Sequence, residues 1–256
     1  MDINKILQDK AYKLFEENKI TCFIGYEQGS LSYKTRPCFI TRKEEVNRLV
    51  FNSFCINNLS IYLEQYKDKK IGILATPCTL RSIIALKQGN QVILENIYIL
   101  GVNCPGMIDP EKINDLHFWE IKSIEENNDK VIINTGEGKH EIIKSSVFYD
   151  KCQNCNHKLP CFYNELLGEE QVNKESCIDE YASVRELEKL PIDERWEYWE
   201  KEFQKCIRCY ACRNVCPVCY CKECVVDKTI PQWISKINQS SINEYYNLMR
   251  VLHVMG

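Results

Sequence analysis

The pattern of apolar and polar positions predicts a helix directly after Asp2. Apolar residues recur there at intervals that place them on one helical face, at Ile3, Leu7, Ala11, Leu14 and Phe15. Asp2 can accept a hydrogen bond from a backbone amide of the first turn and so cap this helix. A second four-residue repeat, at Val46, Val50 and Phe54, predicts a long helix over residues 43–62.

Short runs of apolar residues predict the strands of a sheet. Two extended pieces are expected at residues 22–24 and 38–40, and buried strands at Ile71–Ala75 and Ile97–Val102. A helix over residues 80–88 separates the two buried strands. Strand, helix and strand in this order imply a right-handed crossover and parallel pairing.

The second half of the chain has a weaker pattern. Residues 119–143 read as a small antiparallel piece, and residues 150–161 form a loop with three cysteines. Residues 171–192 are polar and weakly patterned, which predicts a linker. A helix should follow from Asp193, and we expect Trp196, Trp199 and Phe203 to pack in a core because they recur at helical spacing.

Composition narrows the classes of function. The formal net charge is −3 and no basic block is present, which argues against a nucleic-acid partner because phosphate binding needs clustered Lys and Arg. No segment approaches the roughly 18 apolar residues of a membrane span, and residues 1–19 lack the apolar stretch of a signal peptide. The chain is therefore expected to be cytoplasmic. In a reducing compartment, its 16 cysteines are better explained by metal binding than by disulfides.

The most specific signal is the spacing of Cys206, Cys209, Cys212 and Cys216, which is followed by Pro217. This is the bacterial ferredoxin run, in which three cysteines at steps of three surround one [4Fe–4S] cluster and the fourth ligates another cluster. We therefore expect a ferredoxin-like iron–sulfur module here, and refer to these four cysteines as the Cys206 run.

The alternative for this segment is a four-cysteine zinc site. It would use the pairs Cys206/Cys209 and Cys221/Cys224, and it would leave Cys212, Cys216 and Pro217 unexplained. The cysteines at 219, 221 and 224 are extra to the Cys206 run. One of them could supply a missing ligand, or they could be incidental.

A second candidate site lies in the larger part of the chain. Cys78 and Cys104 each follow a predicted parallel strand, and ligands gather at the carboxyl ends of such strands. Cys152 and Cys155 form a loop pair, so the four together make the thiolate set of a [4Fe–4S] cluster. Each element has another reading: a small buried side chain, a zinc pair, or for Cys78 a nucleophile, although no histidine is placed by a motif as its base.

Three motifs in order carry a family resemblance. They are Thr76-Pro77-Cys78, the strand end from Gly101 to Gly106 that contains Cys104, and the pair Cys152-Gln-Asn-Cys155, followed by Glu165-Leu-Leu-Gly168-Glu169. Over residues 20–170 the chain resembles the beta subunits of deazaflavin-reducing hydrogenases and of formate dehydrogenases. The resemblance implies an electron-transfer subunit with Cys78, Cys104, Cys152 and Cys155 as cluster ligands. It also implies that FAD is possible, although no flavin-binding segment is matched. Cys161 is the most plausible substitute ligand, and we expect Cys22, Cys38, Cys55 and Cys177 to be structural.

The expected fold class is α/β, with an open and mostly parallel sheet, helices, a small antiparallel piece and a C-terminal ferredoxin-like module. The expected domains are an electron-transfer domain over residues 1–170, a linker over 171–192 and an iron–sulfur module over 193–256. No G-x-G-x-x-G fingerprint or phosphate loop supports direct nicotinamide or ATP binding.

The function expected is an iron–sulfur electron-transfer subunit of a larger anaerobic complex, with other redox subunits as partners. The complex would be a formate dehydrogenase, a hydrogenase or a heterodisulfide-reductase-like assembly. The alternatives are a flavin-containing oxidoreductase that uses a deazaflavin or similar donor, and a zinc-stabilised interaction module without redox activity.

One further expectation concerns the completeness of the module. A two-cluster ferredoxin fold needs two cysteine runs, and this sequence contains one. Residues 241–255 read as an amphipathic helix with Ile242, Tyr245, Met249 and Leu252 on one face, and Gly256 is a residue type that often leads out of a helix into more chain. We therefore expect the chain to be a fragment or to need a partner, unless Cys219, Cys221 or Cys224 completes a single cluster.

Overall fold

The computed structural model describes residues 2–118, 120–127, 129–169 and 179–255. The chain divides into two units, Met1–Ile178 and Asp179–Gly256. Cys177, which we expected to be structural, lies outside the described residues. Among the described residues, no helix is long and apolar enough to cross a membrane.

The first unit is built on a five-stranded sheet with strand order β2-β1-β3-β4-β8. Its strands are β1 (Cys22–Gln28), β2 (Thr35–Ile40), β3 (Ile71–Ala75), β4 (Ile97–Val102) and β8 (Glu165–Leu167). Strands β1, β3, β4 and β8 pair in parallel, and β2 is antiparallel to β1. All five residues of β3 are buried, as expected for the centre of a sheet covered on both faces.

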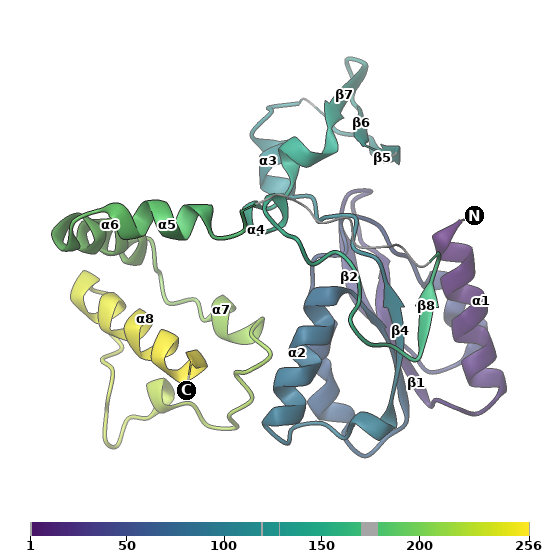
Figure 1. The fold of residues 1–256 in the computed structure, drawn as a ribbon, viewed down its shortest axis with the longest axis horizontal. Helices are drawn as coiled ribbons and strands as arrows, with labels where there is room; N and C mark the ends of the chain where they lie inside the picture. The colour runs from purple at the N-terminus through teal and green to yellow at the C-terminus, as the bar shows by residue number, and fades with distance from the viewer. Residues whose placement is uncertain (1, 119, 128, 170–178, 256) are drawn as a thin grey trace. The chain divides into compact units, whose positions relative to one another are not determined.

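Helices cover this sheet. Helix α1 (Ile3–Glu16) packs against β8, and α2 (Pro77–Gln88) packs against β3; Figure 1 shows the two helices on opposite sides of the strands. As predicted, Asp2 caps α1 by accepting a hydrogen bond from the Asn4 amide at 2.9 Å. Leu7, Ala11 and Leu14 bury the apolar face of this helix.

The prediction of a long helix over residues 43–62 is wrong. Two short 3₁₀ helices form instead, η1 (Lys43–Arg48) and η2 (Leu59–Tyr66). Asn52 accepts a hydrogen bond from the Phe54 amide, and Asn58 accepts one from the Ser60 amide. Asparagine side chains that bond to nearby amides compete with helical hydrogen bonds, so the apolar spacing alone does not hold this segment in one helix.

A second, three-stranded sheet lies within the first unit. Its strands β5 (Ser123–Asn127), β6 (Lys130–Asn134) and β7 (Lys139–Ile143) are antiparallel, as predicted. Around it lie α3 (Pro110–Asn114), η4 (Lys144–Val147) and α4 (Asp150–Gln153), and η3 (Leu94–Asn96) precedes β4. One apolar cluster unites this sheet with the segments beside it, and its buried members are Phe54, Ile108, Ile113, Ile124, Val131, Ile133, Val147 and Phe148.

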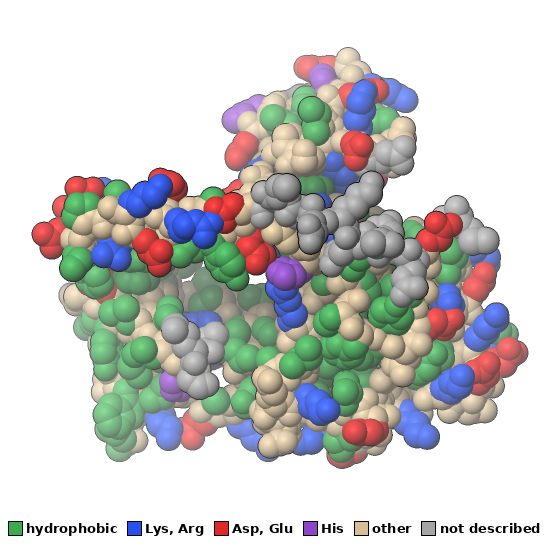
Figure 2. Space-filling model, viewed as in Figure 1, with side chains coloured by type: hydrophobic (Ala, Val, Ile, Leu, Met, Phe, Trp, Pro, Cys, Tyr) green, Lys and Arg blue, Asp and Glu red, His purple; other side chains and the backbone are tan. Residues whose placement is uncertain are grey.

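The second unit consists of helices and loops. Its elements are α5 (Ala182–Lys189), α6 (Ile192–Gln204), α7 (Ala211–Asn214), η5 (Val225–Asp227) and α8 (Ser240–Met255). Part of the segment predicted as a linker is thus helical. Figure 2 shows acidic and basic side chains interspersed with apolar ones over α5 and α6. Trp196 and Trp199 of α6 are 45% and 43% exposed, so the prediction that they pack in a core is wrong.

Candidate metal centres

Two predicted cysteines stand at the carboxyl ends of neighbouring strands. Strands β3 and β4 pair in parallel with Ala75 opposite Gly101, so both end at one edge of the sheet. Cys78 lies three residues beyond β3, in the first turn of α2, and its side chain is exposed. Cys104 lies two residues beyond β4 and is partly buried.

The chain turns sharply after Cys104. Gly106 has a φ of +93°, and a Cβ atom at this position would lie 2.5 Å from the ring of Phe148. Only glycine meets both requirements without strain. The turn brings Ile108 into a bridge with Phe148, and the Tyr149 amide donates a hydrogen bond to the Met107 carbonyl at 3.0 Å.

These contacts place the cysteine loop beside the strand end. The Cys104 amide donates a hydrogen bond to the Lys158 carbonyl at 2.8 Å. Cys152 lies in α4, and its amide donates to the Tyr149 carbonyl at 2.7 Å. The Sγ of Cys155 accepts a hydrogen bond from the His157 amide at 3.4 Å. Both loop cysteines are partly buried.

Electrostatic interactions connect all four thiols of this first site. Burial raises the pKa of Cys104 to about 11; Cys152, Cys78 and Cys155 raise it further, and a backbone hydrogen bond from Gly106 opposes them. The pKa of Cys78 is also raised, first by burial and then by Cys155 and Cys152. The geometry thus places the ends of β3 and β4, which precede Cys78 and Cys104, at one sheet edge, and the hydrogen bond from Cys104 to Lys158 joins the cysteine loop to that edge. Cys22, Cys38 and Cys55 lie elsewhere in the core, buried as expected of structural residues.

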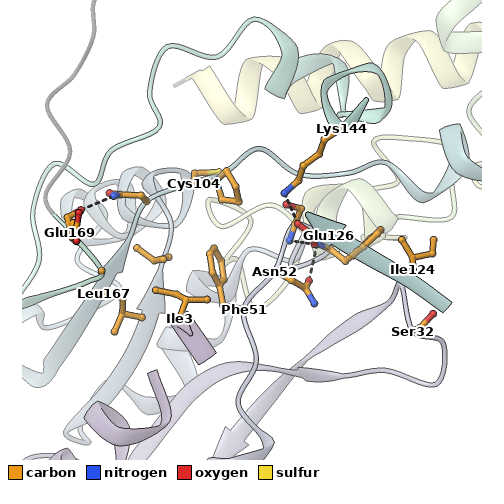
Figure 3. A pocket seen from close by; sticks show the side chains of 16 residues that line it. Ile3, Ser32, Phe51, Asn52, Cys104, Ile124, Glu126, Lys144, Leu167 and Glu169 are labelled. Carbon is orange, nitrogen blue, oxygen red and sulfur yellow. Dashed lines mark hydrogen bonds and ion pairs between the residues drawn. The ribbon is translucent and has the colours of Figure 1, made fainter. Parts of the chain in front are cut away.

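A cavity of about 530 Å³ opens beside Cys104 (Figure 3). On one side of it, Lys144 and Glu126 form an ion pair, and the Ser53 amide donates to the same carboxylate at 2.8 Å. Ser53 also lies at the wall of the cavity; its hydroxyl is fully buried and has no hydrogen-bond partner among the described atoms, which is unusual for a buried polar atom.

In the second unit, the backbone of the Cys206 run has an unusual conformation. Arg208 and Tyr210 both have positive φ values, 52° and 61°. Residues other than glycine seldom adopt this conformation, and such strain concentrates at functional sites. The two turns give the segment between Cys206 and Cys212 a curled path before α7, as expected of a loop that surrounds a cluster.

The extra cysteines lie close to the Cys206 run. Burial raises the pKa of Cys219, and the next largest cause is Cys216. Cys206 and Cys224 both pack against the small core of Val226, Ile234 and Tyr246. Cys209, Cys212 and Cys221 are exposed, and Cys216 is partly buried.

Neither group of cysteines forms a site for a single ion. Among the described residues, no three His, Cys, Asp or Glu side chains are placed to hold one metal ion together. The choice between a zinc site and a cluster therefore depends on the cysteine spacing in the sequence, which favours the cluster.

Sequence reasoning missed several polar residues beside these cysteines. Lys144 and Glu126 lie next to the first site, and Tyr246 and Arg250 of α8 lie next to the second. The spacing of Tyr246 and Arg250 places them on one helical face, but the sequence does not show which face meets the cysteines. The face predicted for this helix was partly wrong, since Tyr245 and Leu252 are 50% and 66% exposed.

Comparisons with known proteins agree with the motifs. Residues 68–162 match the family described as the C terminus of the coenzyme F420 hydrogenase/dehydrogenase beta subunit. Subunit beta of the F420-dependent formate dehydrogenase 1 of Methanococcus maripaludis is 26% identical, over 83% of this chain and 71% of its own length. The F420-dependent formate dehydrogenase subunit beta of Methanocaldococcus jannaschii is 27% identical, over 84% and 72%.

The chain is thus similar to the beta subunits of F420 hydrogenases and formate dehydrogenases. The resemblance expected from the sequence motifs is confirmed, and the family segment contains Cys78, Cys104, Cys152 and Cys155. A chain in the xenon-derivatised structure of the F420-reducing [NiFe] hydrogenase complex from Methanosarcina barkeri is similar with a TM-score of 0.47 and 14% identity. That alignment covers 61% of this chain and 62% of the solved chain.

Proposed function

We propose that this protein is an iron–sulfur electron-transfer subunit of a larger redox complex. The observation that carries the proposal is that Cys78 and Cys104 follow the paired strand ends of β3 and β4, while a hydrogen bond from Cys104 to Lys158 joins this edge to the loop of Cys152 and Cys155. The relationship to formate dehydrogenase beta subunits supports it. The partner subunits would belong to a formate dehydrogenase, a hydrogenase or a heterodisulfide-reductase-like complex.

The first site has the donor set that a [4Fe–4S] cluster requires. Its four candidate ligands are all thiols, and they come from two strand ends and one loop. Cys78 lies in the first turn of a 12-residue helix, whose amides and dipole stabilise thiolate charge. Lys151 and Arg81 lower the pKa of Cys78 and oppose the effect of burial. These residues fit an anionic cluster at this place.

The second unit would hold another cluster through Cys206, Cys209 and Cys212, with Cys216 as a ligand in the same module. The ferredoxin spacing and the curled backbone at Arg208 and Tyr210 support this assignment. We propose residues 1–170 as the electron-transfer domain and residues 193–256 as the iron–sulfur module. When bound, such clusters accept and donate one electron at a time.

The cavity beside Cys104 supports a second candidate function, that of a flavin-containing oxidoreductase. Its volume of about 530 Å³ lies within the range of small-molecule sites, roughly 300–1,000 Å³. Its lining includes the Lys144–Glu126 pair, which could interact with polar groups of a ligand. FAD bound there would lie next to a candidate cluster ligand and could exchange electrons with a deazaflavin donor.

Iron and acid-labile sulfide measured in anaerobically purified protein test the main proposal. The wild-type protein should contain both. Cys104→Ser should lower the iron content by about one cluster, and Cys209→Ser should do the same independently. Cys161→Ser and Cys38→Ser are the matched controls, because Cys161 is exposed in the same loop region and Cys38 is buried in β2; both should keep the wild-type iron content.

Three results would contradict the proposal. Zinc without sulfide in the wild-type protein would exclude an electron-transfer role. Equal loss of iron in Cys104→Ser and Cys161→Ser would exclude the ligand set of the first site. Full iron content in Cys209→Ser would exclude that residue as a ligand.

Flavin binding separates the two candidate functions. Added FAD should bind to the wild-type protein with a change in flavin fluorescence, and Ser53→Leu should weaken this binding because the fully buried position has no room for the larger side chain without a shift of the cavity wall. Iron content serves as the folding control for this variant. Equal fluorescence changes in the wild-type protein and a fully loaded Ser53→Leu variant would exclude the cavity as the flavin site.

A further inference from the structure

Helix α8 meets the Cys206 run through one of its faces. Asn243 donates a hydrogen bond from Nδ2 to the Cys206 carbonyl at 2.7 Å. One turn later, Tyr246 is buried and packs with Cys206 and Tyr210. One turn later again comes Arg250, so three successive turns of the helix contact the cysteine segment.

Two of these side chains converge on a single sulfur. The Nη1 of Arg250 donates a hydrogen bond to the Sγ of Cys212 at 2.9 Å. The hydroxyl of Tyr246 lies 3.8 Å from the same Sγ. Cys212 is thus the member of the Cys206 run that contacts both a cationic donor and a neutral hydroxyl, and that hydroxyl can donate to a thiolate at this position.

The other arginines beside the cysteines have oxygen partners. Arg208 donates to the carbonyls of Ser235 and Ile237. Arg213 pairs with Asp227 at 2.5 Å. No ion pair within the described part of the chain involves Arg250. Its guanidinium instead donates to the Sγ of Cys212.

We propose that Arg250 and Tyr246 are positioning residues that tune the reduction potential of the cluster bound by the Cys206 run. The inference rests on the proposed function, since it requires that cluster. Reduction adds one electron and increases the negative charge on the coordinating thiolates. Hydrogen bonds to a coordinating sulfur stabilise the reduced form more than the oxidised form, and therefore raise the potential.

The test is a redox titration of the anaerobically purified full chain. Dithionite supplies the electron, and EPR of the reduced cluster gives the midpoint potential. Arg250→Gln should shift the midpoint to more negative values. We expect the equilibrium constant for reduction to fall about tenfold, which is about 59 mV for one electron. Tyr246→Phe should shift it in the same direction by less, because the lost donor is neutral and more distant.

The controls separate charge, hydrogen bonding and folding. Tyr245→Phe removes the same hydroxyl from the neighbouring, half-exposed position, and should leave the midpoint unchanged. Arg250→Lys keeps the charge but loses the planar fork, so its midpoint should fall between those of the wild type and Arg250→Gln. If Arg250→Gln does not retain iron, the midpoint potentials of Arg250→Lys and Tyr246→Phe test the proposal instead.

Each failure has its own meaning. A wild-type protein without iron and sulfide in this module would overturn both the proposed function and this inference. Variants that keep wild-type iron and sulfide and also keep the wild-type midpoint would overturn the inference alone. A shift in Tyr245→Phe equal to that in Tyr246→Phe would also overturn it, since the effect would not depend on contact with Cys212.

Discussion

The Nζ of Lys144 lies 2.5 Å from the Oε2 of Glu126, and both side chains are largely withdrawn from solvent. Glu126 also accepts the hydrogen bond of the Ser53 amide through its other oxygen. The carboxylate thus joins η4 to the loop before η2 across the wall of the cavity. A buried ion pair of this kind is costly to break from one side, because the remaining charge loses its partner.

Lys144→Met should destabilise the first unit by about 3 kcal/mol, because it leaves the Glu126 carboxylate with too few partners. Urea denaturation followed by circular dichroism measures the loss. The double variant Lys144→Met/Glu126→Gln should recover part of it, since glutamine still accepts from the Ser53 amide and no charge remains. The exposed pair Lys130–Glu141 provides the control: Lys130→Met should cost far less than Lys144→Met, because water screens the exposed pair. Equal losses at the two pairs would contradict the effect of burial.

Gly106→Ala should destabilise the turn beside Cys104. The added Cβ meets the Phe148 ring at 2.5 Å in a backbone with positive φ. We expect a loss of about 3 kcal/mol from strain and overpacking together. Gly138→Ala is the matched control, because Gly138 also has a positive φ but open space around it; it should lose only about 1–2 kcal/mol. The urea concentrations at the unfolding midpoints of the two variants test this prediction. A smaller loss of stability in Gly106→Ala than in Gly138→Ala would show that the Phe148 ring moves aside freely.

Stability should fall as the pH rises above about 9, because three buried thiols resist ionisation. Burial raises the pKa of Cys22 to about 11 and those of Cys38 and Cys55 to about 12. A thiol with a raised folded-state pKa stays protonated in the folded protein while it ionises in the unfolded chain. Its contribution is therefore complete below the unfolded pKa and is lost as the pH rises towards the folded pKa.

Each such thiol should account for about 1.4 kcal/mol of stability lost per pH unit between about pH 9.5 and 11. Cys38→Ala should make the decline shallower by this amount in urea titrations at several pH values. Cys161→Ala, at an exposed position, should keep the wild-type slope. If the free energy of unfolding falls equally per pH unit in the wild type and in Cys38→Ala, Cys38 does not resist ionisation.

The central sheet could be predicted from sequence, because its signals are local. The apolar runs at Ile71–Ala75 and Ile97–Val102 coincide with β3 and β4, and the crossover between them implies the parallel pairing that is observed. The aromatic residues of α6 show where such reasoning fails. Helical spacing of Trp196 and Trp199 predicts burial, but spacing carries no information about whether another element covers that face.

The candidate sites were predictable to the extent that cysteine spacing is diagnostic. The Cys206 run and the strand-end cysteines are visible in the sequence. The donors to Cys212 are not, because Arg250 reaches it from a helix far along the chain. The Ser53 hydroxyl was also beyond prediction, since its isolation depends on how two distant segments enclose it.

Strand β8 returns to the sheet beside β4, with Leu100 opposite Glu165, after the chain has built the whole antiparallel sheet in between. Cys104 lies at the start of the segment between β4 and β8, and Cys152 and Cys155 lie near its end. A cluster shared by these thiols would act as a cross-link that closes a loop over residues 104–152. A covalent link across a loop of this length restricts the unfolded chain by about 4 kcal/mol. Loading the site with iron and folding the edge of the sheet would then be one thermodynamic event, and the holoprotein should resist unfolding and proteolysis between β4 and β8 more than the apoprotein does.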